Sequence, residues 1–216
     1  MPKGKPKQWS DRATLVRDLR NYNWQKNYTK PLLLDVRQML RKCVAANTFR
    51  AFHNCPKKPS VVFRTWGEAA LTERDFLDSL KSVRSRNSYD EWLTAFAKDF
   101  RNYWRREMRK PISFGHSLKL PNLVVKGLLA RDLPGKMRQR LVWFLHVPLD
   151  SYTIQAIRNC FDGSSAGIGT IPSNASMGFV KDQRMYDSLQ EQIRSLAKEA
   201  GVPPIALDYL AWDGSH

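Results

Sequence analysis

Residues 143–161 read WFLHVPLDSYTIQAIRNCF, an apolar run that ends in Pro-Leu-Asp and continues as an amphipathic pattern. The second half has the apolar spacing of a helix, so Asp150 stands where that helix begins. An Asp at this position can accept hydrogen bonds from the free N–H groups of the first turn, which is capping. A carboxylate fixed there can also act on a reacting group, and the sequence around it leaves both roles open.

Helical spacing of apolar residues dominates the rest of the chain. We expect a long helix from a capping box at 88–91 to about Arg109, with one apolar row. Further helices are expected after Ser10 and Thr72, over 121–130, 135–145 and 151–161, and at the C-terminal end. The residues of the apolar row are Trp92, Phe96, Phe100 and Tyr103. Residues 163–176, rich in Gly and Ser, are expected to form a loop, and SVVFRTW (60–66) is the one weak strand candidate. The predicted fold class is all-α.

Three segments are expected from the composition. Residues 1–10 form a basic N-terminal tail, 11–87 an N-terminal helical part, and 88–216 a second helical part. We expect the two helical parts to pack into one compact unit.

The charge indicates the kind of partner. The 216 residues carry 36 Lys and Arg against 20 Asp and Glu, a net charge of +16. Such an excess favours a polyanion, with nucleic acid first and an anionic membrane surface second; a generally basic protein without such a partner is the alternative. DNA is the expected partner and RNA the less favoured one, since charge alone does not separate them.

Several other classes of site are not expected. The cysteines (Cys43, Cys55 and Cys160) are three in number and widely spaced, which is typical of a reducing compartment. We therefore expect no disulfide framework, no metal site and no cofactor. The N-terminal residues do not resemble a signal peptide, and no apolar run is long enough to span a membrane, so we expect an intracellular protein.

A motif with the character of a phosphate site follows the long helix. Gly115 lies four residues before Lys119, in KPISFGHSLKLPN, where we expect a Gly-containing turn and a helix that begins near Ser117. Such a hairpin leaves backbone N–H groups beside a helix N-terminus, which suits a phosphate. Asp150 follows Lys119 by 150 − 119 = 31 positions, and Lys126 follows it by seven. Near the end, LDYLAW places Asp208 four residues before Trp212.

Together these spacings resemble the helix-hairpin-helix DNA glycosylases, most closely the archaeal 8-oxoguanine DNA glycosylase group. The resemblance covers about half of the chain, mainly from Ser88 onward. It implies a glycosylase-like helical fold and excision of a damaged or modified base from DNA, with or without AP lyase activity. By resemblance, Lys119 is the catalytic nucleophile, Asp150 its catalytic partner, and Asp208 and Trp212 form the base pocket. The expected DNA-binding residues are Gly115, Ser117, Lys126, Arg105, Arg106 and Arg109.

The chain also departs from that family's pattern. Ser117 stands where the hairpin has its second glycine, Pro121 follows Lys119 closely, and Leu123 replaces a base-stacking aromatic residue. Residues 133–135, Leu-Pro-Gly, are similar to the usual hairpin sequence of that family, but we interpret them as the start of a helix. These departures favour, as the alternative, a non-catalytic DNA-binding protein of the same fold. In that case Asp150 is only a cap and Lys119 only a phosphate-binding or surface lysine. Asp208 and Trp212 are then ordinary surface and core residues.

Overall fold

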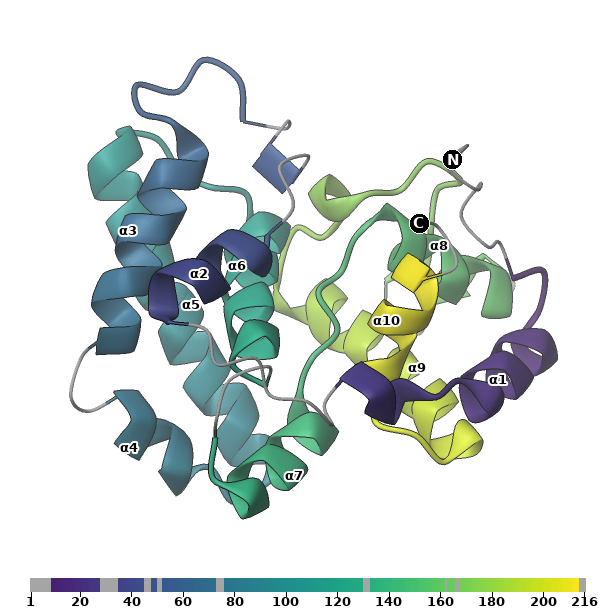
Figure 1. The fold of residues 1–216 in the computed structure, drawn as a ribbon. Coiled ribbons are helices and arrows are strands. Elements are labelled where there is room, and N and C mark those ends of the chain that lie inside the picture. Colours follow the sequence, from purple (N-terminus) through teal and green to yellow (C-terminus); the bar gives the residue numbers. More distant parts are fainter. Residues whose placement is uncertain are drawn as a thin grey trace, which may run out of the picture. The chain divides into compact units, whose positions relative to one another are not determined.

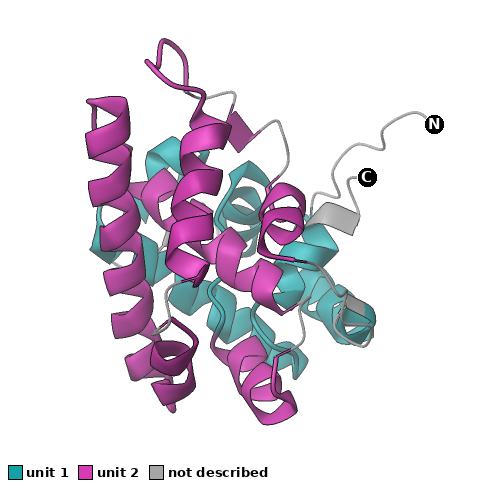
Figure 2. Cartoon of the chain, turned by 60° about the vertical axis from the view of Figure 1, so that its left-hand side comes forward, with its two compact units in different colours: residues 1–29, 145–216 teal, residues 30–144 magenta. Residues whose placement is uncertain are grey.

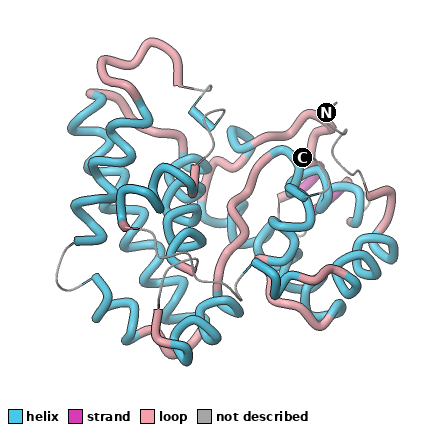
Figure 3. The backbone as a smooth tube through the Cα atoms, viewed as in Figure 1, coloured by secondary structure: helices cyan, strands magenta, loops and turns pink. Residues whose placement is uncertain are grey.

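In the computed structural model, the residues that can be described are 9–27, 35–44, 48–49, 52–72, 76–129, 133–161, 163–165 and 168–213. They are predominantly helical, which confirms the all-α prediction (Figure 1). Strand occurs in this part of the chain as one short antiparallel pair, β1 (Ser164–Ser165) and β2 (Gly169–Thr170), inside the predicted loop (Figure 3). Residues 1–8 of the expected basic tail lie outside the described residues.

The chain forms two compact units, coloured separately in Figure 2. Unit 2 is the continuous segment 30–144, and unit 1 combines 1–29 with 145–216. Ser88, where we placed the start of the second helical part, lies inside a helix of unit 2. The helices of unit 2 are α2 (Val36–Lys42), α3 (Pro59–Thr72), α4 (Phe76–Ser82), α5 (Arg86–Met108), α6 (Phe114–Leu128) and α7 (Gly135–Phe144). Unit 1 contains α1 (Arg12–Asn21), η1 (Trp24–Asn27), α8 (Ser151–Cys160), η3 (Met177–Phe179), α9 (Gln183–Ala200) and α10 (Ala206–Asp213).

The core of unit 2 is an aromatic cluster between α3 and α5. The ring of Trp66 lies 4.5 Å from that of Phe100 and 4.9 Å from that of Phe96, and its indole N–H donates to Asp99 at 2.7 Å. Aromatic pairs at these separations stabilise the fold beyond what the burial of their apolar area contributes. The row predicted from the sequence is therefore right for Phe96 and Phe100, while Trp104 is buried in place of Tyr103.

Several helix boundaries differ from those expected. The N-cap of α5 is Ser85, whose side chain accepts from the backbone N–H of Ser88, so Ser88 is the third residue of the helix. Asp11, and not Ser10, caps α1. Thr72 ends α3 instead of opening a helix, and the strand candidate 60–66 lies inside α3. In that stretch Val62, Phe63 and Trp66 are buried at helical spacing. The helix start predicted at Gly135 is confirmed.

Helix α2 packs closely on two glycines of unit 2. A Cβ atom at Gly67 of α3 would lie 2.7 Å from the side chain of Leu40. At Gly127 of α6 it would lie 2.5 Å from the sulfur of Met39 and 3.0 Å from the Cβ of Cys43. The absence of side chains at these two positions thus lets α2 approach both neighbours.

In unit 1, the buried segment 145–149 runs without helix into α8. The amide of Gln190, on α9, makes two hydrogen bonds with it: the N–H of Val147 donates to Gln190 Oε1 at 3.1 Å, and Gln190 Nε2 donates to the carbonyl of Val147 at 2.8 Å. The ring of His146 shares a hydrogen bond with the hydroxyl of Tyr186 at 3.0 Å. The apolar run in the opening stretch therefore ends α7 and continues as a non-helical segment, 145–149, held by side chains of α9.

Candidate functional site

The hairpin predicted around Gly115 exists, but it lies earlier in the chain. Helix α5 ends at Met108, and Arg109 adopts the left-handed conformation (φ +52°) that glycine usually supplies at a helix end. The turn then runs to Ser113, the N-cap of α6. Gly115 and Ser117 lie in α6 and are buried, so the prediction of a Gly-containing turn with a helix start near Ser117 is wrong. Ser117 packs toward α5, where its hydroxyl accepts from Arg101 at 3.3 Å.

Lys119 lies in the second turn of α6, one turn later than expected, and is half-buried. It lies close enough to His116 to lower the pKa of that imidazole, although burial is the main cause, and together they bring the pKa to about 4. His116 is therefore neutral at pH 7, and its Nδ1 shares a hydrogen bond with Ser113 Oγ at 2.7 Å. Sequence reasoning missed this pair, whose only signal was the Ser-x-x-His spacing at a helix start.

Pro121 lies within α6, where a proline removes one backbone hydrogen bond. Beside the proline, the side chain of Asn122 adds a hydrogen bond to the helix, because its Nδ2 donates to the carbonyl of Leu118 at 2.9 Å. The helix continues to Leu128 and carries Lys126, also half-buried, in its last turn. The positive charge of Lys126 acts on Cys43, the C-cap residue of α2, whose thiol pKa is nevertheless raised to about 12 by burial.

The basic residues at the C-terminal end of α5 have different surroundings. Arg105 and Arg109 are exposed and have no ion-pair partner among the described residues. Arg106 pairs with Glu107 at 3.2 Å and lies over the ring of Tyr103, 4.8 Å from its centroid. Lys110 donates instead to the carbonyls of residues 53 and 54. Arg105 and Arg109 are therefore the residues of this helix end whose charge is most available to a partner.

Asp150 is the N-cap of α8, as its position in the sequence indicated. Its Oδ1 accepts from the backbone N–H groups of Tyr152 at 2.9 Å and Thr153 at 3.0 Å. The Thr153 hydroxyl accepts in return from the N–H of Asp150 at 2.8 Å, which completes a capping box. The residue is only 7% exposed. Capping is therefore an observed role of this carboxylate, and its position is fixed by several contacts.

Asp208 and Trp212 both fall on α10, one helical turn apart, as predicted. Asp208 is in the first turn and only 1% exposed. The side chain of Trp212 lies outside the described residues, so the pair is placed by its backbone alone.

The predicted site residues divide between the two units. Gly115, Ser117, Lys119 and Lys126 share α6 of unit 2, next to the arginines of α5. Asp150 and Asp208 belong to unit 1. The fold of neither unit alone brings Lys119 and Asp150 together.

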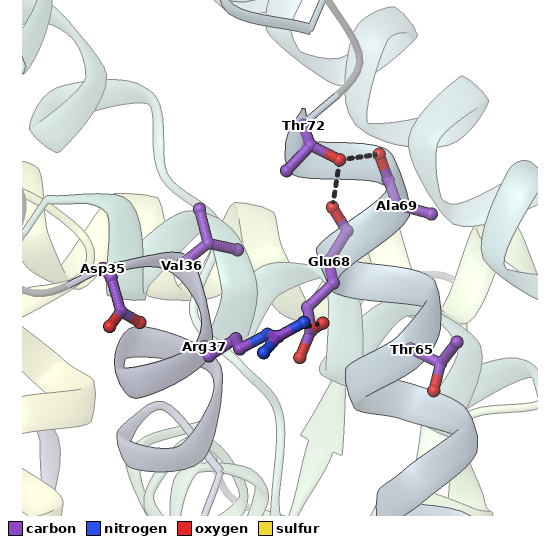
Figure 4. A pocket seen from close by; sticks show the side chains of 7 residues that line it. All are labelled: Asp35, Val36, Arg37, Thr65, Glu68, Ala69 and Thr72. Atoms are coloured by element: carbon purple, nitrogen blue, oxygen red, sulfur yellow. Dashed lines mark hydrogen bonds and ion pairs between the residues drawn. The ribbon is translucent and has the colours of Figure 1, made fainter.

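A separate hollow of about 540 Å³ lies between α2 and α3 (Figure 4). Its lining residues are Asp35, Val36, Arg37, Thr65, Glu68, Ala69 and Thr72. Arg37 and Glu68 pair across it at 3.0 Å, and Thr72 donates to the carbonyl of Glu68 at 2.7 Å. Asp35 is occupied in capping α2. The charged side chains of the lining are thus engaged with protein partners, and we assign the hollow no ligand.

Within the described part of the chain, no three His, Cys, Asp or Glu side chains cluster as metal ligands would. None of the helices described is both long and apolar enough to cross a bilayer. No protein-family model, curated protein or solved structure matches this sequence. The likeness to DNA glycosylases therefore depends on the residues and spacings themselves.

Proposed function

We propose that this protein binds DNA and that its primary contact is the basic end of α5. One observation carries this proposal: Arg105 and Arg109 lie exposed at one helix end without acidic partners among the described residues, in a chain of net charge +16. Phosphate groups supply the negative charge that such guanidinium groups bind, often through two hydrogen bonds.

Salt dependence tests this proposal. Each phosphate contact contributes a slope of about −0.9 to log affinity against log salt for duplex DNA. Replacing Arg105 and Arg109 together with Ala should therefore flatten the slope by about 1.8. Arg106→Ala should change it less, because Arg106 already pairs with Glu107.

The matched control removes the same charge elsewhere. Arg184 and Lys198 are exposed residues of α9 in unit 1, and their double Ala variant lowers the net charge by the same two units. An equal change of slope in both double variants would show that net charge alone governs binding and would exclude a specific contact at α5.

As the activity of the bound protein we propose base excision by a DNA N-glycosylase, with or without an AP lyase step. The support is the resemblance described above together with the placement of Asp150, a carboxylate held at 7% exposure by a capping box and by the segment that Gln190 fixes. A preorganised carboxylate of this kind stabilises positive charge that develops on a sugar when its N-glycosidic bond breaks.

Lys119 is the nucleophile in the lyase version of this proposal. Its unprotonated amine attacks the sugar carbon that carries the base, the glycosidic electron pair leaves with the base, and loss of a proton and ring opening give a Schiff base. In the version without a lyase step, water replaces the amine and Lys119 contacts phosphate only. The base must leave the helical stack first, and Asp208 and Trp212 are the candidates for its pocket.

Borohydride trapping separates these versions from the non-catalytic alternative. Reduction of a Schiff base would link the protein to DNA that contains a lesion or an abasic site, and Lys119→Gln should abolish that adduct. Base release without an adduct would assign the version without a lyase step. The absence of both across a panel of lesions, with DNA binding intact, would refute the enzymatic proposal and leave the DNA-binding one.

A further inference from the structure

A second basic surface of unit 2 surrounds an exposed tryptophan. Trp143, near the end of α7, is 46% exposed, a large fraction for this residue type. The residues that form this surface with it come from α7 and from the region joining α4 to α5: Lys81, Arg84, Arg86, Lys136 and Arg140. We call this set the Trp143 surface.

Two arginines hold the parts of this surface together. Arg86, the first residue of α5, donates to the carbonyl of Trp143 at 2.8 Å. Arg140, on α7, donates to the carbonyl of Lys81 at 3.2 Å. In addition, the rings of Tyr89 and Phe144 lie 6.5 Å apart. Trp143 and Phe144 are thus attached to the N-terminal end of α5, and Arg140 attaches the same helix to α4, so Trp143 is not the tip of a free loop.

Among the described residues, cations outnumber carboxylates on the Trp143 surface. Helix α7 contains three cationic residues and no acidic one. On the facing segment, Asp78 neutralises Lys81 at 2.8 Å, while Arg84 is exposed. Asp90 and Glu91 lie one turn further along α5. Arg84 and Lys136 are the exposed cations of this surface that make no ion pair with another described residue.

We propose that the Trp143 surface binds single-stranded nucleic acid, with an unpaired base stacked on the indole of Trp143 and the phosphates on the surrounding cations. Aromatic side chains beside cationic residues are the usual means of binding unpaired strands, because each base offers a face for stacking. In duplex DNA the bases are stacked on one another, so the exposed indole adds little to duplex binding. This inference deepens the proposed function and rests on it only for the choice of nucleic acid as partner.

The two basic surfaces lie at opposite ends of α5. Arg86 and Arg105 are 19 residues apart, which corresponds to about 28 Å along a helix. A duplex contacts phosphates at the Arg105 end, and an unpaired strand stacks at the Trp143 end. The variants that remove each surface should therefore act independently.

The test compares three probes by fluorescence anisotropy or competition: labelled (dT)12, a 12-base-pair duplex, and inorganic polyphosphate, which has charge but no bases. Trp143→Leu should weaken (dT)12 binding about tenfold or more, the effect of losing one stacked base. Trp143→Phe should restore part of the loss. Binding of duplex and of polyphosphate should stay within about twofold. Leu77→Ala, which truncates another exposed apolar residue of unit 2, is the matched control and should change none of the three.

Other outcomes would overturn the inference in distinguishable ways. Unchanged (dT)12 affinity in Trp143→Leu, with folding confirmed by circular dichroism, would exclude stacking at this residue. An equal loss for all three probes would assign the surface to general charge binding. Failure of the Arg105 and Arg109 variants to alter duplex binding would count against the proposed primary contact and leave the Trp143 surface standing, provided that Trp143→Leu still affects (dT)12 alone.

Discussion

Replacement of Asp150 separates its capping role from a catalytic one. Asp150→Ala removes the acceptor of two N–H groups, of Tyr152 and Thr153, in a site only 7% exposed. Loss of an N-cap lowers the free energy of unfolding by about 1–2 kcal/mol. Because Asp150→Ala leaves buried N–H donors unpaired, we expect a loss at the upper end of this range. For a chain of this length, about 2 kcal/mol corresponds to a fall of about 4–8 °C in melting temperature.

Asp150→Asn should behave differently, because the amide oxygen of Asn can accept the same two hydrogen bonds. Asn is as good an N-cap as Asp, so we expect a melting temperature within about 2 °C of the unaltered protein. If the carboxylate stabilises charge on the sugar, the same variant should lose on the order of a hundredfold or more in base release. DNA affinity should persist or rise slightly, since one carboxylate near the phosphates has been removed.

Thr153→Val provides the matched control, because it removes the hydroxyl that completes the capping box but retains the carboxylate. It should lower the melting temperature and leave most of the base release intact. The assay pairs thermal unfolding with single-turnover base release on lesion-containing duplex DNA. Full activity in well-folded Asp150→Asn would refute a catalytic role, and a melting temperature as low as that of Asp150→Ala would refute the capping estimate.

Three further predictions concern titration, packing and thiol chemistry. The pKa of His116 is lowered to about 4, so the unfolded chain takes up a proton near pH 6.5 while the folded one does not. The stability present above pH 6.5 should therefore fall by up to about 3 kcal/mol as the pH decreases toward 4, a loss measurable by urea unfolding and absent in His116→Gln. Gly127→Ala should destabilise unit 2 by about 1–2 kcal/mol in the same assay, because its Cβ would overlap Met39 and Cys43; an unchanged midpoint would contradict the packing described for α2. Burial raises the pKa of the Cys43 and Cys160 thiols to about 12, so in native protein at pH 8 both should react far more slowly with a thiol reagent than after denaturation, and equal rates would show that they are accessible.

The elements that could be predicted from the sequence are those with strong local signals. The spacing of Phe96 and Phe100 predicts that both are buried on one face of a helix, and both are. The position of Asp150 directly before an amphipathic segment predicts that it caps a helix, and it does. Both are properties of neighbouring residues, so a sequence pattern is enough to find them. The predicted boundaries of α5 and α6 differ from the observed ones for two reasons. Ser85 and Ser88 are both suitable N-cap residues, and Arg109 adopts a left-handed conformation that usually indicates glycine.

The rest of the candidate site depends on contacts between distant residues. No spacing in the sequence indicates that Ser117 accepts a hydrogen bond from Arg101, or that Lys110 is occupied by the carbonyls of residues 53 and 54. From the sequence alone, a lysine or arginine in a basic helix is therefore interpreted as a phosphate ligand, and only the structure shows whether a protein group already binds it. Likewise, the division of the chain at residues 29 and 144 follows from tertiary packing and has no local marker.

That division has a consequence for how the protein is made. Unit 2 is one uninterrupted segment, whereas α1 of unit 1 packs with α9, which lies more than 150 residues later in the sequence. During synthesis, unit 2 can complete its core before unit 1 has all of its helices. The amphipathic α1 must wait, with Leu15, Val16 and Leu19 uncovered, until the ribosome has delivered α8 and α9. The apolar face of α1 is therefore uncovered for longer during synthesis than the core of unit 2, and such uncovered faces favour aggregation.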